Sequence, residues 1–208
     1  MAKRYRKAQA QLPSFDPTLS AEAAIAMLSK AKVRFAIVGG IALWHYLPAS
    51  LQRFTRDVDF AIPYGKRKAL AATIVASGYR PRLLSIGGLA IRQGGLSIDF
   101  VDRHPELSAL FEDAIDAAYR RGPKLRIGGQ KAPVVPKNYL VALKLASGER
   151  RDERDVQALL FTVTTPQYYK LRSFIRRLLG PDGALRLDAL ARRIQHPAVP
   201  QDFYRYDE

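Results

Sequence analysis

Residues 35–62 read FAIVGGIALWHYLPASLQRFTRDVDFAI, and they carry the pattern from which the fold can be inferred. The apolar start predicts a β-strand over 33–38 that ends at a pair of glycines. A short helix should follow the glycines and stop at Pro48. Apolar residues then surround two aspartates at 57–62, which predicts a second strand closed by a proline. Strand, glycine turn, helix and strand in this order indicate an α/β protein.

Asp57 and Asp59 stand two residues apart on the second predicted strand. Side chains alternate between the two faces of a strand, so both carboxylates should project from one face and Val58 and Phe60 from the other. Two neighbouring carboxylates repel each other unless a cation neutralises them. Hard oxygen ligands of this kind suit Mg²⁺ or Mn²⁺. The ordinary alternative is an exposed strand with two surface acids, because a lone D-x-D pair is common.

A third acid, Asp99, interrupts the apolar run LSIDFV at residues 96–101. Ile98 and Phe100 share one face of this predicted strand, and Asp99 lies on the other. If the strand neighbours residues 57–62, three carboxylates meet. Such a set can hold two metal ions about 3.5–4 Å apart. Asp102 has the opposite phase to Asp99, so it is left out of the set.

The remaining pattern divides the chain into an arm, a core and a helical part. We expect a flexible basic arm at 1–20, an α/β core at 21–135 and a helical C-terminal part at 136–208. In the core we expect helices over 21–31, 66–77 and 106–120, the first with Ser20 as its N-cap. We also expect strands over 89–92 and 97–101 joined by a Gly-Gly turn. Extended pieces should follow at 124–127 and 132–135. In the helical part we expect helices over 137–146, 152–162, 166–179 and 182–194.

The charge balance is strongly basic, because 34 Lys and Arg residues face 19 Asp and Glu residues, a net charge of +15. Such an excess favours polyanionic partners such as RNA, although a generally basic composition is the alternative. The chain has no cysteine, which excludes disulfides and Cys-based zinc sites. No apolar run reaches the about 20 residues of a membrane span, so we expect a cytoplasmic protein with no membrane partner.

Gly39 and Gly40 separate the first predicted strand from its helix. Glycines there let the backbone approach a ligand closely, and the free amides of a helix start can hold a phosphate. A tight turn of any α/β protein is the alternative interpretation. The chain has no G-x-G-x-x-G motif and no Walker loop, so dinucleotide-binding and P-loop folds are not favoured.

The glycine pair, the D-x-D pair that follows after sixteen intervening residues and the lone later acid resemble the nucleotidyltransferase (polymerase β-like) superfamily. More narrowly, residues 53–59 (RFTRDVD), 139–145 (YLVALKL) and 151–156 (RDERDV) are similar to its bacterial AbiEii-type toxin-like branch. The resemblance covers about residues 35–160. Many active members have Gly-Ser in place of the glycine pair, so a serine hydroxyl that would grip the triphosphate is missing here.

The resemblance implies the nucleotidyltransferase fold, a small mixed sheet flanked by helices, with a helical C-terminal part. It implies an enzyme that moves a nucleotide from an NTP to an acceptor with Mg²⁺ or Mn²⁺. The acceptor could be tRNA, a protein hydroxyl or a small molecule, and the basic charge favours tRNA or another RNA. The resemblance also suggests a cognate antitoxin protein, as in toxin–antitoxin systems. Catalysis and metal binding then fall to Asp57, Asp59 and Asp99, and nucleotide binding to Gly39, Gly40, Arg56, Lys144 and Asp155.

Two other functions stay open. One is a catalytically inactive protein of this fold that binds RNA or a partner protein, against which the three retained acids argue. The other is a small-molecule nucleotidyltransferase, which the helical C-terminal half would permit.

Lys144 is the only charged residue in the apolar helical stretch 139–146. A buried ammonium group needs a partner. The resemblance suggests a triphosphate or Asp155, whereas a lysine that buries its stem and reaches solvent is the alternative. Asp152 is expected to cap the next helix.

Basic and aromatic residues alternate in YYKLRSFIRR at 168–177. Arg172, Arg176 and Arg177 could form a cationic helix face that meets an RNA backbone. The ordinary explanation is a solvated amphipathic helix with its apolar residues turned inward.

Overall fold

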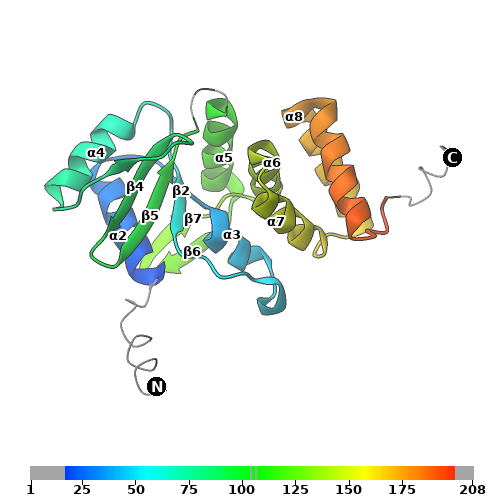
Figure 1. Ribbon diagram of the computed structural model, residues 1–208, viewed down its shortest axis with the longest axis horizontal. Helices are drawn as coiled ribbons and strands as arrows, with labels where there is room; N and C mark the ends of the chain where they lie inside the picture. Colours follow the sequence, from blue (N-terminus) through cyan, green and yellow to red (C-terminus); the bar gives the residue numbers. More distant parts are fainter. Residues whose placement is uncertain (1–16, 104, 106, 200–208) are drawn as a thin grey trace, which may run out of the picture.

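The computed structural model describes residues 17–199 except 104 and 106. A sheet with its covering helices forms one end of an elongated molecule, and the C-terminal helices form the other (Figure 1). The fold class expected from the sequence is confirmed: a small mixed sheet is flanked by helices and followed by a helical part. Within the described residues, no helix is both long enough and apolar enough to cross a membrane.

The elements follow the predicted order with shifted ends. The first half contains α2 (Pro17–Lys30), β1 (Ala36–Val38), α3 (Gly39–Tyr46), a 3₁₀ turn (Ala49–Leu51), β2 (Val58–Ala61), α4 (Arg67–Ala76), β3 (Arg82–Leu83), β4 (Gly88–Gln93), β5 (Leu96–Val101) and α5 (Ser108–Arg121). A hairpin of β6 (Lys124–Ile127) and β7 (Gln130–Pro133) comes next. The chain continues through α6 (Lys137–Ser147), α7 (Arg150–Leu160) and α8 (Thr165–Arg193).

The main sheet has the strand order β1-β2-β5-β4-β3. Strands β2 and β5 run parallel, and the other neighbours run antiparallel. Strands β4 and β5 form the expected hairpin, whose turn places Gly94 at φ 62° and Gly95 at φ 77°. Two successive positive φ values are what a two-residue type I′ turn needs, so the Gly-Gly pair sets the register of this hairpin.

One face of the sheet is apolar and covered by helices. Phe60 on β2 and Phe100 on β5 are fully buried, with ring centroids 6.0 Å apart, and Phe35 meets Phe60 edge-on at 5.6 Å. Helix α2 packs against both strands, and the backbone N–H of Ser97 donates to Ser20 Oγ at 3.1 Å. Burial of this face fixes the phase of β2 and β5, so their alternate residues, the aspartates, are turned to the opposite face.

The C-terminal helices are separated by residues that cannot continue a helix. Gly148 ends α6 in the left-handed conformation at φ 74°. Inside α8, Gly180 has φ 75° and precedes Pro181, so the backbone breaks there into two helical pieces. The expectation of two separate helices, one on each side of residue 180, is therefore confirmed.

Three local expectations differ from the structure. Helix α2 starts at Pro17, so residues 17–20 of the expected arm are helical, while its residues 1–16 lie outside the described residues. Ser20 is buried within this helix and does not cap it. The two-residue strand β3 was not expected, because it is exposed and lacks an apolar pattern.

Candidate active site

Three carboxylates come together on the polar face of the sheet. Asp57 lies just before β2, Asp59 lies on β2, and Asp99 lies opposite Asp59 in the parallel β2–β5 pair. Each of the three offers an oxygen atom within 4.8 Å of the other two. Side chains two residues apart on one strand, and register partners on adjacent strands, share a face. The cluster is therefore a direct consequence of strand phase and register.

The glycine pair makes room for the acids. A Cβ atom on Gly39 would lie 1.9 Å from Asp59 Oδ2, and the φ of this residue is +60°. The backbone N–H of Gly40 donates to the Asp59 carboxylate. A Cβ atom on Gly40 would lie 2.6 Å from the Thr55 side chain, whose Oγ1 is 3.1 Å from Asp57 Oδ1. Both glycines thus allow the start of α3 to approach the aspartates; contact with phosphates remains a prediction.

The site carries more negative charge than the protein neutralises. Burial, together with the charges of Asp57 and Asp99, raises the pKa of Asp59 to about 7, against the opposing effects of Lys144 and the Gly40 N–H. Burial also raises the pKa of Asp99, although Arg92 opposes that shift. Both shifts have the cause expected where carboxylates are grouped and partly withdrawn from water. A bound cation would relieve both.

Arg92 on β4 is the one cation that forms an ion pair with any of the three carboxylates in the described part of the chain. Its Nη2 lies 2.5 Å from Asp99 Oδ1 and 3.8 Å from Asp57 Oδ2. Its Nη1 donates to the carbonyl oxygen of Ile98 at 2.8 Å. The sequence reasoning missed Arg92. Its position opposite Ser97 in the β4–β5 hairpin could have revealed it, because directly opposed residues share a face.

These donors fit a divalent metal ion. Asp99 Oδ1 is buried, and its partner is the guanidinium group of Arg92, whose Nη2 lies 2.5 Å away. One guanidinium group does not neutralise three grouped carboxylates, so a further cation would stabilise the cluster. Three grouped carboxylate oxygens and no sulfur or imidazole are the donor set preferred by Mg²⁺ and Mn²⁺.

Lys144 is buried in a network of ion pairs beside the acids. Its Nζ lies 2.7 Å from Asp152 Oδ1 and 2.6 Å from Asp155 Oδ2. Arg53 donates to both oxygens of Asp155, at 2.7 and 2.9 Å. Burial works against the charge of Asp155, but the hydrogen bonds and charges of Arg53 and Lys144 hold its pKa below the ordinary value. Lys144 therefore has protein partners, as a buried ammonium group requires.

The expectation that Asp152 caps α7 is wrong. The N-cap position belongs to Glu149, and no side chain makes a capping hydrogen bond there. Asp152 instead accepts from Lys144 and from the hydroxyl of Ser147 at the end of α6. It therefore joins α6 to α7 at the point where both helices meet the carboxylates.

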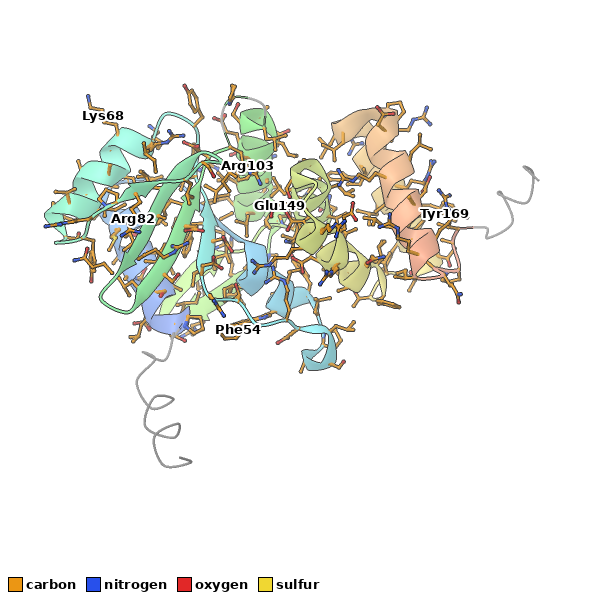
Figure 2. The ribbon with its side chains drawn as sticks, in the orientation of Figure 1. Phe54, Lys68, Arg82, Arg103, Glu149 and Tyr169 are labelled. Carbon is orange, nitrogen blue, oxygen red and sulfur yellow. The ribbon has the colours of Figure 1, made fainter. Side chains whose placement is uncertain are left out.

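A cavity of about 250 Å³ opens at the carboxylates. Figure 2 labels Arg103, from the sheet-bearing half, and Glu149, from the C-terminal helices, and both line the cavity. The other charged residues that line it are Arg53, Asp57, Asp59, Asp99, Lys144, Arg151 and Asp152.

Among the residues expected to bind nucleotide, the structure brings Gly39 and Lys144 to the cavity wall. Gly40 and Asp155 lie behind the wall and hold Asp59, Lys144 and Arg53 in place. Arg56 is exposed and does not line the cavity.

No protein-family model matches the chain, and no curated protein matches its sequence. Among solved structures it is similar to the antibiotic-resistance factor ANT(2″)-Ia, with 17% identity, coverage of 87% of this chain and 93% of that one, and a TM-score of 0.45. It is also similar to a nucleotidyltransferase-like protein from Paracoccidioides brasiliensis, with 19% identity, coverage of 86% of this chain and 95% of that one, and a TM-score of 0.48. The lincosamide antibiotic adenylyltransferase LnuA is 17% identical, with coverage of 67% of this chain and 94% of that one, and a TM-score of 0.42. With TM-scores under 0.5, these likenesses carry no functional argument, and the case for a function rests on the carboxylate site.

Proposed function

We propose that the protein is a nucleotidyltransferase that moves a nucleotide from an NTP to an acceptor hydroxyl. The hydroxyl oxygen bonds to the α-phosphorus, the bond to the β-phosphate breaks, and pyrophosphate and the hydroxyl proton are released. The observation that supports this proposal is the meeting of Asp57, Asp59 and Asp99, each with an oxygen within 4.8 Å of the other two, at a place where burial raises the pKa of Asp59 and Asp99. Asp57, Asp59 and Asp99 would hold Mg²⁺ or Mn²⁺, which supplies neutralisation of the triphosphate charge and of the charge that develops on transfer.

The residues of the chain contribute positioning and charge. The Gly40 N–H fixes the orientation of the Asp59 carboxylate, and the missing side chain of Gly39 keeps the space beside it open. Arg103 and Arg151 line the cavity together with Lys144, so cations stand next to the acids at the place where a triphosphate would bind. Catalysis of phosphoryl transfer depends mostly on such positioning and charge stabilisation.

A role in a toxin–antitoxin pair is a finer proposal, supported by the resemblance of residues 53–59, 139–145 and 151–156 to the AbiEii-type branch. In the structure these segments supply an ion-pair network in which Arg53 and Lys144 line the cavity and Asp155 lies behind them. A cognate antitoxin would be sought by expressing the chain with the products of neighbouring reading frames. Growth arrest by the chain alone, relieved by one such product, is the result that supports this role.

The test of transfer uses each of the four NTPs labelled at the α-phosphate, with Mg²⁺ and total tRNA or cell lysate as the acceptor pool. We expect label in an acceptor with the parent protein and none with Asp59→Asn. The matched control is Asp113→Asn, which removes an exposed carboxylate from α5 and should keep full activity. Absence of transfer with every NTP and every pool, together with calorimetry that finds no Mg²⁺-dependent NTP binding, would contradict the proposal.

A further inference from the structure

A second and larger cavity, of about 810 Å³, lies between the end of α5, the start of α6 and the first half of α8. Four cations line it and no carboxylate does: Arg121 on α5, Lys137 on α6, and Lys170 and Arg177 on α8. We refer to these four residues and the space between them as the basic groove. Lys170 and Arg177 are seven residues apart with Phe174 between them, so the three lie along one face of α8.

The cations of the basic groove are not neutralised by the protein. None of the four forms an ion pair with a carboxylate in the described ranges 17–103, 105 and 107–199. Arg172, on the same helix, differs because Asp188 binds its guanidinium group at 2.8 Å, so the cationic face expected from Arg172, Arg176 and Arg177 loses one member. An uncompensated cluster of like charges favours an anionic ligand.

Three of these cations are held in place by aromatic rings. Lys137 Nζ lies 5.6 Å from the ring centroid of Tyr46 and donates to Thr162 Oγ1 at 3.1 Å. Arg121 lies over Tyr139 at 5.9 Å, and Arg177 lies over Phe174 at 5.5 Å. Contact with a ring orients a cation without removing its charge. Burial also lowers the pKa of Lys137, an effect that a bound anion would reverse.

Tyr169 adds a surface on which a base can stack. It lines the groove, its residue is 54% exposed, and its hydroxyl donates to the carbonyl oxygen of Ala198 at 3.1 Å. The ring is thus anchored at its hydroxyl end and open to solvent. Cations that track a phosphate backbone, combined with an accessible aromatic ring, are the features with which proteins bind single-stranded nucleic acid.

We propose that the basic groove binds a single-stranded segment of RNA and guides it toward the carboxylate site. Lys137 in the groove and Lys144 at the carboxylates are seven residues apart on α6, which is two helical turns or about 10 Å. Both side chains leave the helix on nearly the same side, and both meet α7 or the residues just after it. That the bound RNA is the acceptor rests on the proposed transferase function, whereas the binding itself does not.

Binding is tested by fluorescence anisotropy with a labelled single-stranded RNA oligonucleotide, without NTP, on the Asp59→Asn protein and on the parent. The double variant Lys170→Gln/Arg177→Gln should weaken binding about tenfold or more, and the slope of log affinity against log salt should shrink by about 1.4, for two lost phosphate contacts. The matched control is Lys68→Gln/Arg82→Gln, which removes the same charge at the opposite end of the molecule from Tyr169 (Figure 2) and should bind as the parent does.

Of three decisive results, the first and the last would overturn the proposal, and the second would restrict it to the phosphate contacts. Equal weakening in both double variants would mean that net charge alone attracts RNA. An unchanged affinity in Tyr169→Leu would remove the stacking contribution. Competition by poly-glutamate as strong as competition by unlabelled RNA would point to an acidic protein as the ligand.

The acceptor role is measured separately from binding. If the parent transfers label to RNA and the groove double variant does so with an unchanged KM for RNA, the groove is not the acceptor site, although the transferase function stands. If RNA binds the groove but no transfer occurs with any NTP, the transferase proposal fails and the groove proposal stands.

Discussion

Asp59 on β2 and Asp99 on β5 are direct register partners in a parallel strand pair, so their carboxylates stand side by side on one face of the sheet. Asp57 belongs to the same group, since an oxygen of each lies within 4.8 Å of the others. Like charges at this separation are unfavourable when partly withdrawn from water. The sheet therefore holds an arrangement that a divalent cation would stabilise.

Metal binding should stabilise the fold. A ligand that binds only the native state at a hundred times its Kd adds about 2.7 kcal/mol to the free energy of unfolding. We expect Mg²⁺ or Mn²⁺ to raise the Tm of the parent protein and to leave that of Asp59→Asn unchanged, measured by scanning calorimetry at fixed ionic strength. Asp113→Asn should respond like the parent. An equal rise in Asp59→Asn would show that the ions bind elsewhere.

The metal-free protein should lose stability as the pH rises. The pKa of Asp59 is raised to about 7 in the folded protein, against about 3.9 for an unfolded aspartate. A carboxyl group whose pKa is raised by folding stabilises the folded state fully at pH values below its pKa in the unfolded chain. This stabilisation is lost as the pH rises through its pKa in the folded protein. Between about pH 4 and 7 the loss is at most about 1.4 kcal/mol for each pH unit.

The pH effect is measured by urea unfolding from pH 5 to pH 8 in the presence of EDTA. In this pH range Asp155 stays ionised, because its pKa in the folded protein is lowered. Asp59→Asn lacks the titrating group, so its free energy of unfolding should change less with pH than that of the parent. Parallel curves for the two proteins would show that Asp59 is ionised throughout the range.

Gly39 should tolerate no side chain. In Gly39→Ala the new Cβ would meet Asp59 Oδ2 at 1.9 Å and would also carry the strain of a φ near +60°. We expect a loss of about 2–4 kcal/mol in the free energy of unfolding, together with loss of Mg²⁺ binding. Gly78→Ala is the matched control, because its φ is +84° but nothing lies within 4 Å of its Cβ. It should cost about 1 kcal/mol and leave metal binding unchanged; similar losses in both variants would contradict the contact with Asp59.

The aspartates could be placed from the sequence because their environment is periodic. Val58 and Phe60, like Ile98 and Phe100, are apolar and buried, so alternation assigns Asp59 and Asp99 to the other face. The glycine pair and the Gly-Gly hairpin turn were recognisable for a similar reason, since each depends on local backbone geometry. What alternation does not provide is the pairing of β2 with β5, which is a long-range contact.

The rest of the site depends on contacts that no local pattern contains. Arg53 meets Asp155 from 102 residues away in the sequence, so neither residue signals the other. Arg56 resembles Arg53 in type and lies closer to the aspartates in sequence, yet it is exposed whereas Arg53 lines the cavity. The basic groove likewise combines three helices, and only the α8 part of it, with Arg177, could be expected from the sequence.

Lys144 should matter both for stability and for nucleotide binding. Its side chain is 7% exposed and pairs with Asp152 and Asp155, so Lys144→Gln leaves a buried carboxylate with a single partner, Arg53. Removing one member of a buried ion pair costs about 3–5 kcal/mol, and the remaining Arg53 contact should keep the loss near the lower end.

Two measurements separate the roles of Lys144. Urea unfolding gives the stability, and calorimetry with an NTP and Mg²⁺, at a temperature where Lys144→Gln is fully folded, gives the nucleotide affinity. We expect the affinity to fall about tenfold or more, because the cavity wall loses a cation next to Asp59. Arg154→Gln, which removes an exposed cation from α7 away from the cavity, should change neither quantity. If Lys144→Gln is less stable but binds NTP as tightly as the parent, Lys144 joins α6 to α7 and takes no part in holding the triphosphate.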